Sequence, residues 1–344
     1  MKSGTMRTVA LVLTLLCMSA VACLPPAAQP PSAPATPSEI RPANETPSTV
    51  QPEKEELPAY PLTIIDDTGR KVPIQKLPQR IVSLAPSNTE ILFALGLDDK
   101  IVGTTDYCDY PQAAKTKPRV AGYSNPNIEK LLSLEPDLVV AESIHERMVL
   151  PALERLGLTV VVTRATSLEV VLHDIELLGQ ITGRSKAATQ IVTSMKARID
   201  AIVSKTSTLT PEQRPRVLYV CWHAPIWTMG SETFIDDLIW KAGGMNVFAA
   251  DFKQSRAVSL EAVVTKNPEV IIVSGMGTAG DLIYNAILRE ERLKDVDAII
   301  SHRVYKVSDA SLIERPGPRI VDGLEEVAKY IHPEIFGKGQ ASQR

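Results

Sequence analysis

The sequence has few of the residues on which disulfide frameworks and metal sites depend. Its 344 residues include four cysteines and five histidines, and the histidines are scattered. Cys17 lies in an apolar N-terminal segment and Cys23 directly after it, which leaves Cys108 and Cys221 for the folded part. One cysteine in each half of the chain argues against a disulfide framework and excludes a metal cage built from sulfur alone. We expect two free thiols, no metal centre and no cofactor.

The chain also lacks an excess of charge of either sign. Its net charge is −3, and basic and acidic residues are interspersed without a basic stripe of the kind that binds phosphates. Nucleic acid is therefore not an expected partner. The G-x-S-x-G and H-E-x-x-H patterns of two large hydrolase classes are absent from the sequence as well. These absences favour a binding protein over an enzyme.

The N-terminus is typical of an export signal. Lys2 and Arg7 precede the apolar run "VALVLTLLCMSAVAC", which is too short to span a membrane. Small residues stand before Cys23, as in bacterial lipoprotein signals that are cut so that this cysteine carries lipid. Plain secretory cleavage near Ala22 is the alternative. We expect residues 1–22 to be a lipoprotein signal peptide and the mature protein to be anchored at the outer face of the cytoplasmic membrane.

The next segment, residues 23–59, is rich in proline and poor in large apolar residues, so it cannot form a core. It is predicted to be a lipid-anchored, disordered tether that would extend roughly 110 Å as polyproline II. Such a tether would keep the folded part close to a membrane partner. The polar residues 337–344 are predicted to form a disordered tail.

Between these ends, short aliphatic runs alternate with helical patterns, which predicts the α/β fold class. The runs lack strict alternation of polar and apolar residues, as expected for parallel strands with both faces covered. We predict two Rossmann-like α/β lobes, residues 60–184 and 208–336, each with a central, largely parallel sheet. Residues 185–207 contain neither glycine nor proline and are predicted to form one long rigid helix that joins the lobes around a ligand cleft.

One sequence unit occurs twice, which supports two similar lobes. "NIEKLLSLEPDLVVAES" begins at Asn127 and "SLEAVVTKNPEVIIVSG" begins at Ser259, each predicting a capped helix, a turn and a strand. Glu129 and Glu261 fall in the first turns of the two helices. A first-turn carboxylate stabilises a helix by about 0.3–1 kcal/mol through the helix dipole, which is the structural explanation. A matched pair could instead bind arginines of a two-fold symmetric partner.

A second helix start is predicted in "APSNTE". Ser87 is expected to be the N-cap and Glu90, three residues later, to complete a capping box. We assign Glu90 this structural role.

The motifs together resemble the cobalamin and ferric-siderophore branch of the ABC-transporter substrate-binding proteins, of periplasmic binding protein type III. The resemblance covers about residues 62–335, and within the branch the cobalamin-binding members are the most similar. It rests on "RIVSLAPSNTEILFALGL", "TDYCDYP", "NIEKLLSLEPDLVVA" and "ERPGPRIVDGLEEVA". It implies a monomer that delivers a ligand to a permease dimer driven by a cytoplasmic ATPase. Glu129 and Glu261 would each meet an arginine of one permease subunit.

Aromatic residues make up only 5% of the chain, yet they gather after the predicted strands, where ligands bind in open α/β sheets. An apolar ring with a donor at its edge suits a broad, flat macrocycle. The expected ligand-binding residues are Tyr107, Tyr110, Tyr123, Trp222, Trp227, Phe252, Asp309 and Arg315. Of these, the resemblance places Tyr107, Tyr123, Trp227 and Arg315 at ligand contacts.

The expected ligand is cobalamin or another corrinoid, because cations are scarce in these loops. Besides Arg315, only Arg164 and Arg256 are candidates, whereas a triply anionic iron catecholate would need several. A ferric siderophore or haem remains the alternative. The sequence departs from the cobalamin-binding relatives at Glu142, where they carry tryptophan. His145, Cys108 and His223 are weaker candidates for an axial ligand to a cleft-bound metal.

One motif points to a different class of protein. "GMGTAG", from Gly275 to Gly280, matches the dinucleotide pattern G-x-G-x-x-G after a predicted strand and before a predicted helix. The acidic residue that should end the next strand is not in place, because Asp295 and Asp297 come before that strand and Asp309 comes too late. An NAD-dependent oxidoreductase is therefore the distant alternative, and the glycines more simply let the backbone approach a ligand.

Overall fold

The computed structural model describes residues 58–275 and 279–337. The predicted signal peptide, Cys23, most of the predicted tether and residues 338–344 lie outside the described residues. Within the described residues, no helix is long and apolar enough to cross a membrane.

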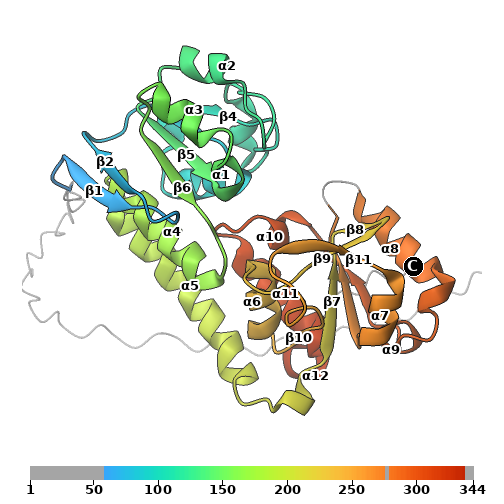
Figure 1. The fold of residues 1–344 in the computed structure, drawn as a ribbon. Coiled ribbons are helices and arrows are strands. Elements are labelled where there is room, and N and C mark those ends of the chain that lie inside the picture. The colour runs from blue at the N-terminus through green and yellow to red at the C-terminus, as the bar shows by residue number, and fades with distance from the viewer. Residues whose placement is uncertain (1–57, 276–278, 338–344) are drawn as a thin grey trace, which may run out of the picture. The chain divides into compact units, whose positions relative to one another are not determined.

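The first lobe is built on a four-stranded parallel sheet (Figure 1). Its strands stand in the order β4 (Ile101–Thr104), β3 (Ile81–Ser83), β5 (Leu138–Glu142) and β6 (Val160–Thr163). Aliphatic side chains on both faces of these strands are buried, which explains why the strand sequences do not alternate. The other elements are the antiparallel hairpin β1 (Leu62–Ile65) and β2 (Lys71–Ile74), the helices α1 (Pro86–Ala94), α2 (Ile128–Ser133) and α3 (Leu150–Arg155), and the 3-10 turns η1 (Asp98–Lys100), η2 (Gln112–Thr116) and η3 (Ser143–His145).

The second lobe repeats this plan with a parallel sheet of its own. The order is β10 (Met245–Asn246), β7 (Arg216–Val220), β12 (Val270–Val273) and β13 (Val304–Lys306). A small antiparallel sheet of β11 (Ser255–Val258), β9 (Ile226–Met229) and β8 (Trp222–His223) lies beside it. The helices are α6 (Phe234–Lys241), α7 (Leu260–Lys266), α8 (Ala279–Arg289), α9 (Asp297–Ile300), α10 (Ser311–Glu314), α11 (Ile320–Ile331) and α12 (Pro333–Phe336), with the 3-10 turns η4 (Pro211–Gln213) and η5 (Glu291–Leu293).

One long helix joins the lobes, which confirms the predicted fold class. This helix, α5 (Ser185–Thr206), packs against α4 (Leu168–Ile181) and against α6 and α11 of the second lobe. Its buried residues Met195, Ile199 and Ile202 belong to a core that contains side chains of both lobes. Because α5 is fastened along its length to helices on both sides, it limits how far the lobes can move apart.

The two copies of the sequence unit form the predicted helix, turn and strand in both lobes. The Asn127 side chain accepts a hydrogen bond from the amide of Lys130 at 2.9 Å, and Ser259 accepts one from Ala262 at 3.1 Å. Glu135 and Asn267, which both precede the proline of the unit, adopt left-handed backbone with φ of 45° and 43°. The repeat is therefore a repeat of backbone geometry.

The capping box predicted at Ser87 and Glu90 is wrong. Helix α1 begins two residues earlier than predicted, at Pro86, and its N-cap is Ala85, which provides no side-chain hydrogen bond. Pro86 at the first helical position fits this start, because proline lacks the amide hydrogen that would have no partner there. Glu90 is left for another role.

Close packing of α4 on α5 provides a test of the joint between the lobes. A Cβ atom on Gly179 would lie 2.4 Å from Cβ of Ala188 and 3.1 Å from the carbonyl oxygen of Arg184. Gly179→Ala is therefore expected to lower the free energy of unfolding by about 1–3 kcal/mol, measured by urea denaturation. Adding Ala188→Gly removes the closer clash and should restore part of the loss. Equal stability of Gly179→Ala and wild type would contradict this packing.

Candidate ligand-binding cavity

A cavity of about 970 Å³ lies between loops of the two lobes. On the first-lobe side it is bounded by the loop after β4, by the segment around Tyr123, by the first turn of α1 and by Glu142 at the end of β5. On the second-lobe side it is bounded by the chain from Asp309 to Arg319. These segments follow the carboxyl ends of parallel strands, which is where open α/β sheets bind ligands.

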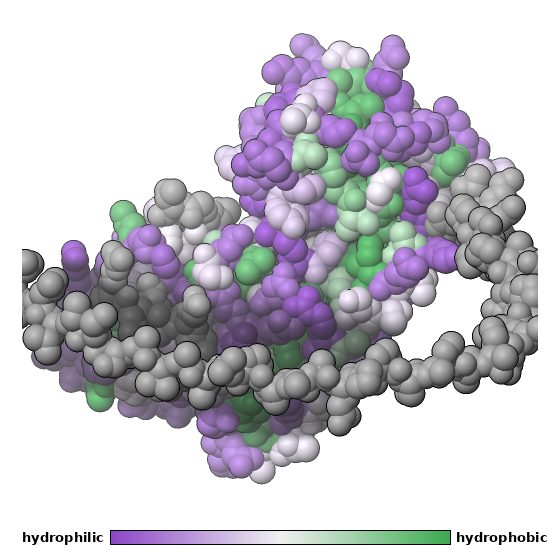
Figure 2. Space-filling view, turned by 180° about the vertical axis from the view of Figure 1, so that it is seen from behind, coloured by the Kyte–Doolittle hydropathy of each residue, from purple (hydrophilic) through white to green (hydrophobic). Residues whose placement is uncertain are grey.

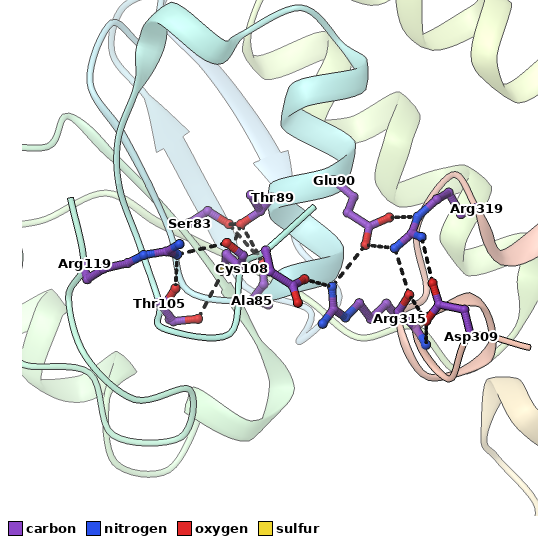
Figure 3. Close-up of polar contacts among 12 residues, drawn as sticks. Ser83, Ala85, Thr89, Glu90, Thr105, Cys108, Arg119, Asp309, Arg315 and Arg319 are labelled. Atoms are coloured by element: carbon purple, nitrogen blue, oxygen red, sulfur yellow. Dashed lines mark hydrogen bonds and ion pairs between the residues drawn. The ribbon is translucent and has the colours of Figure 1, made fainter. Parts of the chain in front are cut away.

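A network of polar side chains stabilises the loop after β4, which lines the cavity (Figure 3). The Arg119 guanidinium donates to the Thr104 hydroxyl at 2.9 Å and to carbonyl oxygens of Thr105 and Cys108. The Cys108 sulfur lies 3.1 Å from the Thr89 hydroxyl and 3.2 Å from that of Thr105. Tyr107, Asp109 and Tyr110 are therefore carried by a loop whose backbone is fixed at several points.

Ion pairs connect the lobes at one side of the cavity (Figure 3). The carboxylate of Glu90, nearly fully buried, accepts two hydrogen bonds from Arg319, from Nε at 2.8 Å and from Nη2 at 2.7 Å. Nη1 of Arg315 lies 3.6 Å from the same carboxylate and also binds Asp109. Glu90 and Asp109 belong to the first lobe, and both arginines belong to the second. These ion pairs therefore connect the two lobes beside the cavity.

The two arginines stay charged in this setting. Hydrogen bonding to Glu90 raises the pKa of Arg319, whose guanidinium also lies 3.6 Å from the ring centroid of Tyr110. Burial acts against the charge of Arg315, but the carboxylates of Asp109 and Glu90 outweigh it and raise the pKa. The positive charge of both side chains is thus largely matched by carboxylates of the protein.

A second cluster forms the wall at the end of β5. The Tyr123 hydroxyl donates a hydrogen bond to the carboxyl group of Glu142, which lines the cavity. Burial raises the pKa of Glu142, and the hydrogen bond from Tyr123 partly offsets this. Burial and the neighbouring Glu142 charge raise the pKa of Tyr123, so the phenol stays protonated.

His145 stabilises the cavity wall that Tyr123 and Glu142 form. It is fully buried, its Nδ1 lies 3.0 Å from the amide of Glu142, and its Nε2 lies 2.6 Å from the carbonyl oxygen of Tyr123. Burial lowers the pKa of His145, so the ring is neutral, with Nε2 as donor and Nδ1 as acceptor. The histidine therefore ties together the two backbone segments that carry Tyr123 and Glu142.

The structure brings five of the eight expected ligand-binding residues to the cavity lining. These are Tyr107, Tyr110, Tyr123, Asp309 and Arg315. Tyr107 and Tyr110 expose 60% and 44% of their surface, so their rings are available to a ligand.

The other three expected residues, all on the second lobe, do not line this cavity. Trp222 and Trp227 stand opposite each other across β8 and β9 and are partly exposed. Phe252 stacks on Phe248, with ring centroids 5.6 Å apart, and packs against a hydrophobic core of the second lobe. The local order of residues predicted that these aromatics follow strands, but not that a small antiparallel sheet carries the tryptophans.

The structure does not support an axial role for the three metal-ligand candidates. Both ring nitrogens of His145 are engaged by backbone, and Cys108 is buried between two threonines. His223 is partly buried on β8, away from the cavity lining. Within residues 58–275 and 279–337, no three histidine, cysteine or acidic side chains are grouped so that they could hold a metal ion. Cys108 and Cys221 are free thiols.

Glu129 and Glu261 are both exposed in the first turns of α2 and α7. The side chain of Glu261 is 75% exposed, and its only described ion pair is a contact of 3.8 Å with Arg292. Backbone and Ser259 hydrogen bonds lower the pKa of Glu261, so its carboxylate is charged at neutral pH. Hydrophilic side chains cover most of the molecular face shown in Figure 2, so exposure of a charge alone does not mark a docking site.

The glycines of "GMGTAG" have a packing role in the described part of the motif. A Cβ on Gly275, which has a φ of 89°, would lie 2.7 Å from Ile283, and one on Gly280 would lie 2.7 Å from the carbonyl oxygen of Ser274. Gly277 lies outside the described residues. The two described glycines thus allow the loop after β12 to approach the start of α8.

Sequence reasoning missed several cavity residues for identifiable reasons. Glu90 has the spacing of a helix-capping residue, and Arg319, four residues after Arg315 in "RPGPR", stands in no local pattern that marks it as a cavity residue. Their pairing across 229 positions has no local sequence signal. Glu142 departs from the cobalamin-binding relatives, and its place at the end of β5 is the available signal for a position in the cavity wall.

The buried carboxyl group of Asp174 leads to a prediction about how the stability of the protein depends on pH. Burial, with the neighbouring Asp67 and Glu142, raises the pKa of Asp174 from 3.8 to about 10. The folded protein thus keeps a proton that the unfolded chain loses, so this group costs stability increasingly as pH rises from about 4 toward 10. Asp174→Asn is expected to raise the melting temperature at pH 8 more than at pH 5, measured by calorimetry. An equal change at both values would contradict a protonated Asp174.

Comparisons with known proteins agree with this geometry. A family described as periplasmic binding protein matches residues 81–310. An uncharacterized ABC transporter substrate-binding lipoprotein of Bacillus subtilis, YvrC, is 36% identical over 82% of this chain and 89% of its own.

Two solved structures share the fold. The periplasmic vitamin B12 binding protein of Vibrio cholerae is 30% identical, with a TM-score of 0.66 over 76% of this chain and 99% of its own. The periplasmic heme-binding protein RhuT of Roseiflexus, in apo form, is 25% identical, with a TM-score of 0.65 over 74% of this chain and 98% of its own.

Proposed function

The chain belongs to the periplasmic binding protein family, and from this premise we propose that it captures cobalamin or a related corrinoid and delivers it to a membrane permease. Family membership makes it a solute-binding component of an ABC transporter and not an enzyme. An NAD-dependent oxidoreductase is thereby excluded.

The charge balance of the cavity is the observation that carries this proposal. Its lining contains five carboxyl side chains and three basic ones. The acidic residues are Asp106, Asp109, Glu142, Asp309 and Glu314, and the basic ones are Lys115, Arg315 and Arg319. Because both arginines already pair with carboxylates, little positive charge is left for an anion. A near-neutral macrocycle that rests on tyrosine rings fits this cavity better than a multiply charged iron chelate.

The size of the cavity is compatible with this ligand class. At about 970 Å³ it lies at the upper end of the range of small-molecule sites. Exposed rings of Tyr107 and Tyr110 offer flat apolar faces, and their hydroxyl groups can bond polar groups at a macrocycle edge.

A haem or ferric-siderophore ligand is the second candidate. It is supported by the similarity to the heme-binding protein of Roseiflexus and by Tyr107, since an exposed phenol is a known type of haem iron ligand. The paired arginines argue against it, because haem carboxylates would have to compete with Asp109 and Glu90 for them.

We further propose that Glu129 and Glu261 dock onto the permease and that Cys23 carries a lipid anchor. Each glutamate occupies the first turn of the equivalent helix of its lobe, so the pair can meet two equivalent subunits. The relative in Bacillus subtilis is a lipoprotein by name. A lipid at Cys23 would place the protein at the outer face of the cytoplasmic membrane, beside the permease and its ATPase.

Calorimetric titration with cobalamin, cobinamide, haem and a ferric hydroxamate tests the proposed ligand class. We expect saturable binding of cobalamin and cobinamide, with haem and the hydroxamate at least tenfold weaker. Saturable binding of haem or the hydroxamate, with no heat from either corrinoid, would refute the corrinoid proposal and leave the transport role in place.

A further inference from the structure

The wall formed by Tyr123 and Glu142 has properties of a selective subsite. Glu142 is partly buried, lines the cavity and has only acceptor atoms when ionised. A carboxylate can accept up to about four hydrogen bonds, so those from the Tyr123 hydroxyl and the backbone amide of His145 leave acceptor capacity for a ligand. The subsite is thus built to receive a donor.

The position of this carboxyl group is fixed. Its partner Tyr123 is partly buried and contacts His145 edge to face, with ring centroids 5.6 Å apart. The same histidine holds the backbone of both residues through its two ring nitrogens. A carboxyl group fixed in this way cannot turn away from a poorly matched ligand, so a mismatch there reduces affinity.

The charges around the subsite favour the same ligand chemistry. On the first-lobe side, the cavity lining contains three carboxyl residues, Asp106, Asp109 and Glu142, and one basic residue, Lys115. The two arginines of the cavity lining, Arg315 and Arg319, bind Asp109 and Glu90. A carboxylate on the ligand would therefore meet like charge at this wall, whereas an N–H group would meet an acceptor.

We propose that Glu142, presented by Tyr123 and positioned by His145, is a specificity-determining residue that accepts a hydrogen bond from an N–H group of the ligand. The chemistry it selects is a primary carboxamide or an ammonium group, and it disfavours a carboxylate at the same position. Corrinoids carry carboxamides around their ring, whereas haem carries carboxylates. The inference rests on the proposed function only in naming the corrinoid amides as the donors.

The test uses matched ligand pairs that differ only in this chemistry. One pair is an amidated corrinoid and the same corrinoid with peripheral amides hydrolysed to carboxylates. The other pair is haem and the derivative whose propionates are converted to primary amides. A third arm compares the haem amides with the corresponding primary amines, which separates a carboxamide from an ammonium donor. Affinities are measured by calorimetry on the full chain.

Wild type is expected to prefer the amide over the acid within whichever pair it binds. Glu142→Gln should reduce that preference about tenfold, because glutamine can donate to a carboxylate as well as accept from an amide. Glu146→Gln is the matched control: it removes a carboxylate four residues away that pairs with Arg164 outside the cavity lining, and it should leave the preference unchanged. Tyr123→Phe should lower affinity for both members of a pair and retain part of the preference.

The choice of macrocycle and the amide preference are separate results. Binding of the haem pair instead of the corrinoids would refute the corrinoid proposal, while an amide preference that depends on Glu142 would still support the subsite. An equal amide preference in wild type and Glu142→Gln, or no preference in wild type, would overturn the subsite. Equal melting temperatures of Glu142→Gln and wild type would show that a changed preference does not come from misfolding.

Discussion

Uptake of the ligand is expected to be abolished when Glu129 and Glu261 are both replaced by alanine, while the affinity for the ligand stays within about twofold of wild type. Both carboxylates are exposed and lie in α2 and α7, outside the cavity lining. Under the proposed docking role, their loss would remove two charge-assisted contacts to permease arginines, and neither residue lines the cavity. Transport into vesicles that contain the permease and its ATPase is the measurement, with calorimetry for affinity.

The matched control replaces two other exposed glutamates, Glu176 on α4 and Glu212 in η4, by alanine. This variant loses the same charge and should transport at the wild-type rate. Each single docking substitution should give an intermediate rate, because one lobe would still bind its subunit. Equal loss of transport and affinity in the double variant, or wild-type transport by it, would contradict the docking role.

Glu90→Ala is expected to cause the largest loss of stability among substitutions at the cavity, about 2–3 kcal/mol of unfolding free energy. It removes the bidentate partner of Arg319, whose side chain is 16% exposed, and leaves that guanidinium with Asp309 at 3.5 Å as its carboxylate partner. The substitution also breaks a contact between the lobes. Urea denaturation measures the stability, and the distance between spin labels on the two lobes measures their separation.

Glu176→Ala serves as the control here too, with an expected change within about 0.5 kcal/mol. Arg319→Lys should lose part of the stability, since lysine cannot bind the carboxylate at two points. A Glu90→Ala variant as stable as wild type, with an unchanged distribution of distances, would show that this ion pair does not fasten the lobes.

The fold could be predicted from the sequence because its signals are local. Aliphatic runs such as Leu138–Glu142 are read as buried strands, and the uninterrupted pattern of Ser185–Thr206 is read as a long helix. The cap residues Asn127 and Ser259 have side chains that suit a helix start in any protein. Each of these predictions needs only residues within one element.

The site was less predictable because its residues act across the chain. Glu90 has the spacing of a capping residue, and only the approach of "RPGPR" from the second lobe makes it an ion-pair partner. His145 has the chemistry of a metal ligand, and only burial beside Tyr123 commits both of its nitrogens to backbone. Tertiary contacts that a local pattern does not contain decide such roles.

A crystal structure of the protein with cobalamin would test the central claim most directly. The account predicts density for the macrocycle in the cavity, against the rings of Tyr107 and Tyr110, with Arg315 within hydrogen-bonding reach of its edge. Macrocycle density elsewhere on the molecule, or an empty cavity in crystals grown at saturating cobalamin, would contradict it.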